Sequence, residues 1–279
     1  MSQLEQLKSD IEAIQRKLDA GDSNAAHDQQ KSVIDVINAL DTGRVRVANK
    51  IDGTWVVNSW VKQAILMYFR ITDMKEMEVG PFVFRDKIPL KRNFKDLNIR
   101  VVPPAVARIG TFMEPGVVMM PSYVNIGAYV GARTMVDTWA TVGSCAQVGA
   151  DVHLSGGVGI GGVLEPAQAA PVIIEDGAFL GSRAIVVEGV HIGKEAVLAA
   201  NVTLTSSTPI VDLRGKDRSI IKGHVPERCV VVPGTLEKDA PQGGGKIHTQ
   251  CAYIIGERKP STDLKTSLNS ALREFAVSV

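Results

Sequence analysis

Bulky apolar residues recur at every sixth position through the middle of the chain. A period of six matches neither the 3.6 residues of a helical turn nor the simple alternation of a half-buried strand. It is typical of a solenoid in which each hexad contributes one short strand and a corner, and three hexads close a triangular coil. The two runs, the second offset by eight residues, are Val106, Phe112, Val118, Val124, Val130, Val136, Val142, Val148, Leu154 and Ile160, then Ile174, Leu180, Val186, Ile192, Leu198 and Leu204.

The same pattern predicts how the solenoid is filled. We expect each bulky residue to point into the prism and to stack on its equivalent in the next coil, which makes the interior a ladder of aliphatic side chains. Gly, Asn or Ser often follows the bulky residue directly, and these residues tolerate the bend at a corner. The period does not fix the hand of the solenoid, although parallel crossovers are usually right-handed.

Residues 1–99 lack the hexad period and predict a small helical or α+β domain. Apolar residues step by three and four in this region, which indicates amphipathic helices, and two short apolar runs flank an Asp-Gly turn. The expected elements are helices at 4–18, 33–40 and 59–69 and strands at 44–47 and 55–57.

The solenoid is expected over residues 100–235, with two interruptions of its register. An inserted loop occupies 166–173, and a charged excursion occupies 209–223. Residues 236–279 form a C-terminal extension, in which an apolar stripe at 264–275 predicts a helix. Because the terminal coils of a solenoid need a cover, we expect this helix to lie over the open end.

Composition narrows the class of partner. The chain has 279 residues, 45% of them hydrophobic and only 5% aromatic, so it can bury a core that is mostly aliphatic. The formal net charge of +1 provides no basic surface for nucleic acid or an anionic membrane. No apolar run is long enough to span a bilayer, and the polar N-terminus lacks a secretion signal. We therefore expect small-molecule substrates, no nucleic-acid or membrane partner, and a cytoplasmic location.

Asp137 is the leading candidate for chemistry on this solenoid. A packed prism leaves sites only on its outer faces, at loops or between subunits. Asp137 directly follows the inward Val136, at a position where most hexads carry a small residue. A carboxylate there can bind, orient or deprotonate an amine. The alternative is an exposed corner residue with no catalytic role.

Other reactive residues are weaker candidates. His153 and His191 are too far apart for a compact zinc motif and have no third ligand at a regular interval, so surface histidines are expected. Cys145 has no basic neighbour in sequence and is expected to pack rather than to act as a nucleophile. The glycine-rich segment 155–162 lacks the Lys-Ser or Lys-Thr of a nucleotide loop, and we expect it to let a long cofactor approach the backbone.

Three long segments, at 120–130, 135–147 and 153–166, resemble the tetrahydrodipicolinate N-succinyltransferases of bacterial lysine and diaminopimelate synthesis. The sequence Arg-Val-Val-Pro-Pro at 100–104 and the helical N-terminal region fit the same family. The resemblance implies a mainly β chain built on a left-handed parallel β-helix, and a homotrimer with sites between adjacent β-helices. It also implies transfer of succinyl from succinyl-CoA to the amino group of ring-opened tetrahydrodipicolinate.

The resemblance further implies roles for six positions of this sequence. Arg100 matches an arginine that binds the dicarboxylate substrate, a role suited to its forked donors. Asp137 matches the acidic residue that is central to the reaction. The positions that fall where the pantetheine arm of CoA runs along the coil in this family are Gly156, Gly159, Ser182 and Ala200.

One departure from the family concerns the acid–base groups. Relatives often carry a glutamate where this chain has Ile185, and Glu188 lies three residues further on. The hypothesis is therefore direct attack, in which Asp137 orients and deprotonates the amine, backbone amides polarise the thioester carbonyl and CoA leaves as a thiolate. A covalent anhydride on Asp137 is the alternative. Because a thioester is already activated, no metal is expected.

Three other interpretations are compatible with the residues. Another acyl-CoA transferase on the same solenoid, using acetyl-CoA or a sugar nucleotide, would rely on a histidine base such as His153 or His191. A zinc-dependent hydratase of the hexapeptide type would need three histidines that converge between subunits. A scaffold solenoid would bind no CoA.

Overall fold

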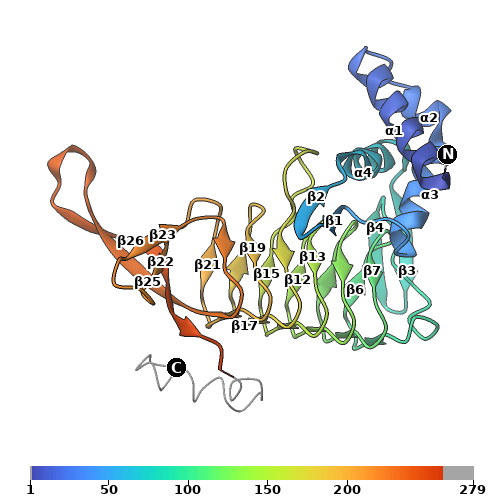
Figure 1. Ribbon diagram of the computed structural model, residues 1–279. Helices are drawn as coiled ribbons and strands as arrows, with labels where there is room; N and C mark the ends of the chain where they lie inside the picture. The colour runs from blue at the N-terminus through green and yellow to red at the C-terminus, as the bar shows by residue number, and fades with distance from the viewer. Residues whose placement is uncertain (1, 260–279) are drawn as a thin grey trace.

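Three parallel sheets form the sides of a prism that runs through the middle of the molecule, as Figure 1 shows. The structure is a computed structural model, and it describes residues 2–259. Each coil of the prism contributes a two-residue strand to each side, and each strand pairs in parallel with its equivalent in the next coil. The predicted solenoid with three strands per coil is confirmed.

The β7 sheet consists of β7 Phe112–Met113, β10 Tyr129–Val130, β13 Gln147–Val148, β16 Ile173–Ile174, β19 His191–Ile192 and β24 His224–Val225. The β6 sheet consists of β6 Val106–Ala107, β9 Tyr123–Val124, β12 Thr141–Val142, β15 Gly159–Ile160, β18 Ile185–Val186 and β21 Thr203–Leu204. The ten-stranded sheet contains β5 Arg100–Val101, β8 Val118–Met119, β11 Met135–Val136, β14 His153–Leu154, β17 Phe179–Leu180 and β20 Val197–Leu198. It continues through β25 Cys229–Asp239, β26 Lys246–Glu257, β22 Ile210–Asp212 and β23 Ser219–Ile221.

The interior ladder is aliphatic, and its predicted register is confirmed from Val124 onward. The thirteen predicted positions from Val124 to Leu204 are each 2% exposed or less. The first three predicted positions are wrong by one residue, because the buried side chains are Ala107, Met113 and Met119. The step from Met119 to Val124 is five residues instead of six, because this side of the coil is one residue short. Every inward position before it therefore lies one residue later than the six-residue period predicts.

The N-terminal region packs helices and a hairpin beside the β7 sheet (Figure 1). The three helices expected from the apolar stripes are present, whereas the strand expected at 44–47 begins only at Ala48, and the second hairpin was not predicted. The elements are α1 Gln3–Asp19, α2 Ala25–Asp28, α3 Gln30–Asp41, β1 Ala48–Ile51, β2 Thr54–Val57, α4 Ser59–Ile71, β3 Lys75–Val79 and β4 Phe82–Asp86.

A buried interface joins this region to the prism. Its apolar core includes Ile126 and Cys145, which belong to the coils of the β-helix. The inserted loop between β15 and β16 also reaches this interface, where Leu164 packs against the same core. Lys62 of α4 is fully buried and donates a hydrogen bond from Nζ to the carbonyl oxygen of Ala169 in the loop at 2.6 Å. The loop is therefore held against α4.

The C-terminal part of the described chain is a long antiparallel hairpin of β25 Cys229–Asp239 and β26 Lys246–Glu257, which projects from the prism (Figure 1). A one-turn 3₁₀ helix, Pro241–Gly243, lies in its loop. The excursion at 209–223 forms a smaller hairpin of β22 Ile210–Asp212 and β23 Ser219–Ile221, and β22 pairs with β26. These hairpins were not predicted. The helix expected at 264–275 lies outside the described residues.

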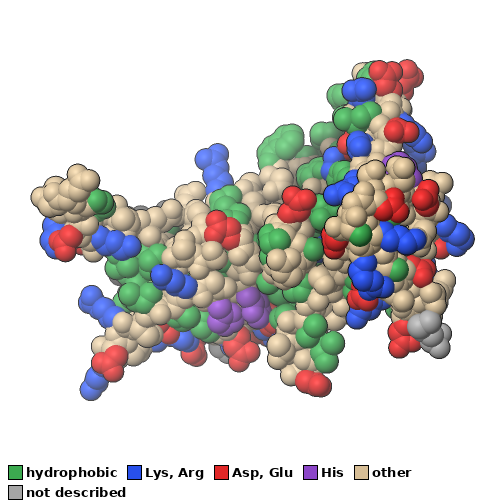
Figure 2. Space-filling view, turned by 90° about the horizontal axis from the view of Figure 1, so that it is seen from above, with side chains coloured by type: hydrophobic (Ala, Val, Ile, Leu, Met, Phe, Trp, Pro, Cys, Tyr) green, Lys and Arg blue, Asp and Glu red, His purple; other side chains and the backbone are tan. Residues whose placement is uncertain are grey.

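Charged side chains are scattered over the surface. Figure 2 shows Lys and Arg interspersed with Asp and Glu along the face in view. Within residues 2–259, none of the helices combines the length and the apolar character that a bilayer crossing requires.

Candidate active site on the ten-stranded sheet

Asp137 lies at the end of β11, where its backbone continues the ladder. Its amide donates to the carbonyl oxygen of Leu154 at 2.9 Å, and its side chain points outward, 30% exposed. One carboxylate oxygen, Oδ1, accepts hydrogen bonds from the amide of Thr138 at 2.6 Å and from its hydroxyl at 3.2 Å. These bonds fix the carboxylate at the corner and leave Oδ2 directed elsewhere.

His153 is the neighbour of that second oxygen. Strands β11 and β14 pair Met135 with His153, which puts His153 and Asp137 on the same outer side of adjacent coils. The distance from His153 Nε2 to Asp137 Oδ2 is 3.5 Å, and the imidazole lies against Phe179 with ring centroids 5.3 Å apart. The sequence suggested a lone surface histidine, but the side chain is only 20% exposed and faces a carboxylate.

An 18-residue coil could have revealed this pair from the sequence. Three hexads bring residue 153 beside residue 135, and Asp137 lies two residues beyond Met135 on the same outer face. A carboxylate next to an imidazole is a group that can accept a proton and share it. The pair therefore has the chemistry expected of a base for an amine.

Arg100 lies on the same sheet but does not contact Asp137. It is exposed at the start of β5, which pairs with β8, the neighbour of β11. Two strand spacings correspond to about 10 Å across a sheet, and Asp137 lies a further two residues, about 7 Å, along the strand from the level of Arg100. Arg100 and Asp137 thus project from one face, where a small amino dicarboxylate could place a carboxylate at Arg100 and its amine at Asp137.

The corner that follows this sheet forms an edge of the prism, and three of the four predicted cofactor positions lie on it. Gly156, Ser182 and Ala200 occupy equivalent places in successive coils, in line with Thr138. The carbonyl oxygens of Thr138, Gly156 and Ser182 each accept a bond from the coil above, from Gly157, Arg183 and Asn201.

The amides along this edge are available to a ligand. Within residues 2–259, the N–H groups of Gly156, Ser182 and Ala200 have no hydrogen-bond acceptor. Ser182 and Ala200 are exposed, and a Cβ added at Gly156 would lie 3.4 Å from the carbonyl oxygen of Thr138. A row of unpaired donors beside Asp137 suits a chain that carries amide carbonyls, such as the pantetheine arm of CoA.

Gly159 lies away from this edge. It belongs to β15 on the β6 sheet, its amide donates to the carbonyl oxygen of Ala184, and a Cβ there would come within 2.7 Å of Ile185 Cδ1. Ile185, which stands at the position expected for a family glutamate, therefore covers Gly159. Glu188 does not replace that glutamate, because its carboxylate accepts hydrogen bonds from the hydroxyl and amide of Ser206 at 2.7 and 3.2 Å.

Trp139 was not selected from the sequence although it lies two residues from Asp137. It is 69% exposed, and its amide donates to the carbonyl oxygen of Pro121. A large exposed indole at a tight corner marks an interaction surface. Its position in the motif, directly after Thr138, was the available signal.

The remaining reactive residues lie elsewhere. Cys145 is fully buried between the prism and the N-terminal region, and burial raises the pKa of its thiol to about 12, against the smaller effect of the Lys62 charge. Packing therefore accounts for it, as the sequence indicated. In the part of the chain that the structure describes, no group of three or more His, Cys, Asp or Glu side chains is arranged to hold a metal ion.

Comparisons with known proteins find N-succinyltransferases as matches to both the N-terminal region and the prism. A family model described as Tetrahydrodipicolinate N-succinyltransferase N-terminal matches residues 6–71, and one described as Hexapeptide repeat of succinyl-transferase matches residues 171–206. The 2,3,4,5-tetrahydropyridine-2,6-dicarboxylate N-succinyltransferase of Thioalkalivibrio sulfidiphilus is 50% identical over 281 residues, which cover 99% of this chain and 100% of that protein.

Two further matches have related descriptions. The protein of the same name from Nitrosomonas europaea is 48% identical and covers 97% of this chain and 99% of its own length. A solved structure from Campylobacter jejuni, described as a 2,3,4,5-tetrahydropyridine-2-carboxylate N-succinyltransferase, is 19% identical with a TM-score of 0.49, covering 80% of this chain and 62% of that one.

Proposed function

From the premise that this chain belongs to the tetrahydrodipicolinate N-succinyltransferase family, we propose that the ten-stranded sheet and its edge carry the acceptor and donor sites of that enzyme. The chain is a CoA-dependent N-acyltransferase of the succinylase branch of lysine and diaminopimelate biosynthesis, and its β-helix is the left-handed one of hexapeptide-repeat proteins. This identity decides against the hydratase and the scaffold interpretations.

The observation that carries the proposal is the position of the Asp137–His153 pair. The pair lies where the sheet that bears Arg100 meets the edge with unpaired amides. An acceptor whose carboxylates bind Arg100 can present its amine to Asp137, while a thioester bound along the edge presents its carbonyl. His153 Nε2 lies 3.5 Å from the second carboxylate oxygen and can share the proton.

The chemical step is a direct transfer. The amine nitrogen attacks the thioester carbonyl carbon, so a C–N bond forms and the C–S bond breaks. The amine proton passes to Asp137, and CoA leaves as a thiolate that takes up a proton afterwards. Edge amides stabilise the negative charge that develops on the carbonyl oxygen. The product is an N-acyl acceptor.

We also assign succinyl-CoA as the donor, a homotrimer as the assembly and the cytoplasm as the location. The donor agrees with the names of the relatives. Flat prism sides are suited to association around a threefold axis, and a trimer would place a neighbouring subunit over the open site. The three cysteines are free and buried, which fits a reducing compartment.

A steady-state assay with succinyl-CoA and acetyl-CoA side by side tests the donor. We expect the kcat/KM for succinyl-CoA to exceed that for acetyl-CoA by about two orders of magnitude, because a site built for a terminal carboxylate penalises its absence. Equal values would contradict the assignment. Sedimentation equilibrium tests the assembly, and a monomer at all concentrations would refute the trimer.

A further inference from the structure

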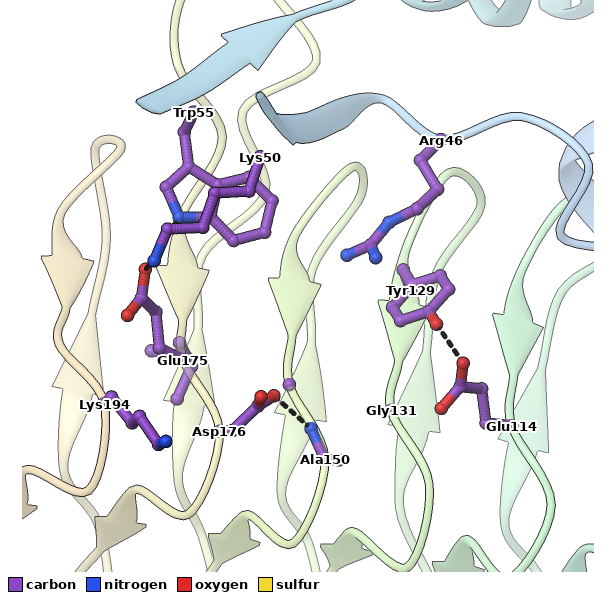
Figure 3. A pocket seen from close by; sticks show the side chains of 12 residues that line it. Arg46, Lys50, Trp55, Glu114, Tyr129, Gly131, Ala150, Glu175, Asp176 and Lys194 are labelled. Atoms are coloured by element: carbon purple, nitrogen blue, oxygen red, sulfur yellow. Dashed lines mark hydrogen bonds and ion pairs between the residues drawn. The ribbon is translucent and has the colours of Figure 1, made fainter. Parts of the chain in front are cut away.

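A cavity lies on a different side of the molecule from Asp137, between the N-terminal region and the β7 sheet. It has a volume of about 360 Å³, which is at the lower end for ligand sites and suits a small metabolite rather than a nucleotide. Figure 3 shows its lining, with Arg46, Lys50 and Trp55 reaching in from the N-terminal segment above the coils. Neither Asp137 nor Arg100 lines it.

Arg46 is held rigidly in this cavity. Its Nε donates to Gln147 Oε1 at 3.0 Å, and Gln147 is itself buried and donates to the carbonyl oxygen of Cys145 at 3.0 Å. The guanidinium carbon lies 3.4 Å from the ring centroid of Tyr129 and 5.7 Å from that of Trp55. The side chain is therefore fixed from two sides by stacking and from a third by a hydrogen bond.

The two terminal nitrogens of Arg46 remain unused. Neither has a hydrogen-bond acceptor among residues 2–259, and in Figure 3 they are directed into the opening next to Tyr129. The hydroxyl of Tyr129 donates to Glu114, whose other oxygen accepts from the amide of Ala132 at 2.8 Å, so Glu114 is already engaged. A fixed guanidinium with a free fork is the geometry that binds a carboxylate.

The opposite wall carries a negative charge. Asp176 Oδ1 accepts from the amide of Ala150 at 2.8 Å, while Oδ2 has no donor in the described chain. Glycines let the coils approach closely at this wall, because a Cβ at Gly149 would come within 2.3 Å of Asp176 Oδ1 and one at Gly131 within 2.4 Å of the Ala150 amide.

On the third wall, the charge of Glu175 is already paired with a charge of the protein itself. Glu175 Oε1 accepts from Lys50 Nζ at 2.7 Å and from Trp55 Nε1 at 2.9 Å. Burial alone would raise the pKa of Glu175, but these two bonds and the nearby His191 lower it to about 2. Glu175 is thus a fixed anion matched by Lys50. The charges left for a ligand are those of Arg46 and Asp176, with Lys194 also lining the cavity.

We propose that this cavity is a binding site for a small amino acid, whose carboxylate binds the fork of Arg46 and whose ammonium group binds Asp176. A simple anion would leave Asp176 unmatched, and a simple cation would leave Arg46 unmatched. The bound zwitterion would connect the N-terminal segment to the coils and stabilise their association. The site lies apart from Asp137 and is independent of the acyl-transfer proposal.

Isothermal titration calorimetry with three probes tests the charge requirement. L-Lysine carries both groups, cadaverine is its decarboxylated form, and succinate carries carboxylates alone. We expect L-lysine to bind with a Kd of about 1 mM or below, and the other two at least about tenfold more weakly, since each loses one charged hydrogen-bonded contact. No binding of L-lysine up to about 10 mM, or equal binding of cadaverine, would overturn the proposal.

Variants locate the binding. Arg46→Gln should weaken L-lysine binding about tenfold or more, whereas Arg44→Gln, an exposed arginine of the same segment outside this cavity, should not. Asp176→Asn keeps an acceptor for Ala150 and removes the charge at an exposed position, so it tests the site even if Arg46→Gln unfolds. The Asp137→Asn variant should bind L-lysine normally. Loss of binding in that variant, or full binding in Asp176→Asn, would refute the site.

Discussion

On the β7 sheet, Glu175 lies beneath the N-terminal hairpin with its side chain 13% exposed, whereas Asp137 beside the ten-stranded sheet faces solvent with 30% exposed. Two outward side chains of the β7 sheet, Gln147 and Ile173, are also 1% and 4% exposed, whereas Met135 and Phe179 of the ten-stranded sheet are half-buried. Both faces rest on the same aliphatic ladder. The difference therefore comes from what covers each face.

Whether another part of the chain packs over a carboxylate decides which role that carboxylate can have. Glu175 receives hydrogen bonds from Lys50 and Trp55, so it is a structural anion that joins two regions. Both carboxylates lie beside an imidazole, Glu175 at 3.1 Å from His191 and Asp137 at 3.5 Å from His153, but among residues 2–259 the Asp137 side chain accepts hydrogen bonds from Thr138 alone. Its second oxygen can therefore serve a substrate. The covered acid should support stability, and the open one should support turnover.

The largest effect is expected from a change to the ladder that both faces share. Val142 is fully buried, so Val142→Asp would place an unpaired charge in the prism and cost more than about 4 kcal/mol of folding free energy. We expect no folded protein by circular dichroism. Thr141→Asp, on the same strand but facing outward, is the control and should melt normally. A Val142→Asp protein with an unchanged melting curve would show that the inward register is wrong.

Asp137→Asn should separate turnover from stability most clearly. It keeps the size and the bonds from Thr138 but removes the proton acceptor, so kcat should fall by about two to four orders of magnitude. Thermal unfolding should be unchanged, and Asp151→Asn, an exposed acid next to β14, should keep full activity. A variant that retains more than about a tenth of kcat, a barrier change of only about 1.4 kcal/mol, would return Asp137 to the role of a corner residue.

Arg100→Ala tests the open face at its other end. Loss of a charged contact to a carboxylate should raise the KM of the acceptor about tenfold or more while the KM of the CoA donor stays constant. Arg92→Ala, also exposed and just before the prism, serves as the control. Equal effects on both KM values would mean that Arg100 acts on the fold and not on the acceptor.

Glu175→Gln tests the covered face and should have the smallest effect. The pKa of Glu175 is lowered to about 2 from 4.5, so its contribution to stability is present above the higher value and is lost as the pH falls toward the lower one. With allowance for solvent screening, the variant should lose about 1–2 kcal/mol of unfolding free energy at neutral pH. Denaturant unfolding at pH 7 and near pH 3 measures this.

The outcomes distinguish the two faces. The difference in unfolding free energy between wild type and Glu175→Gln should decrease as the pH is lowered. The kcat of the variant at neutral pH should hardly change. A difference that is independent of pH would remove the ionic part of the argument. A loss of kcat as large as that of Asp137→Asn would end the distinction between a structural and a reactive carboxylate.

The ladder could be predicted from the sequence because one buried aliphatic per six residues leaves a strong periodic trace. The phase of the first coils could not, since Val106 and Ala107 are both apolar and a five-residue side of a coil leaves no signal of its own. The hairpin of β25 and β26 was also not predicted, because the six-residue register that indicates the solenoid fails after Leu204.

The site divides in a similar way. Asp137 stands out where most hexads have a small residue, and the coil length then fixes His153 as its neighbour. Lys50 and Glu175 are 125 residues apart in sequence, and their contact depends on how the N-terminal hairpin packs on the prism. No local sequence pattern can therefore predict it. The same holds for Arg46 and Tyr129, whose stacking unites two regions with separate patterns.

Strand pairing along the prism connects residues at a nearly constant distance in sequence. Met135 pairs with His153, 18 residues on, whereas Gln147 pairs with Ile173, 26 residues on, because the inserted loop intervenes. The entropy of loop closure grows with the logarithm of length, so the longer coil costs only about 0.3 kcal/mol more to close. Folding can then propagate coil by coil from any formed neighbour, and a loop placed at a corner hardly slows it.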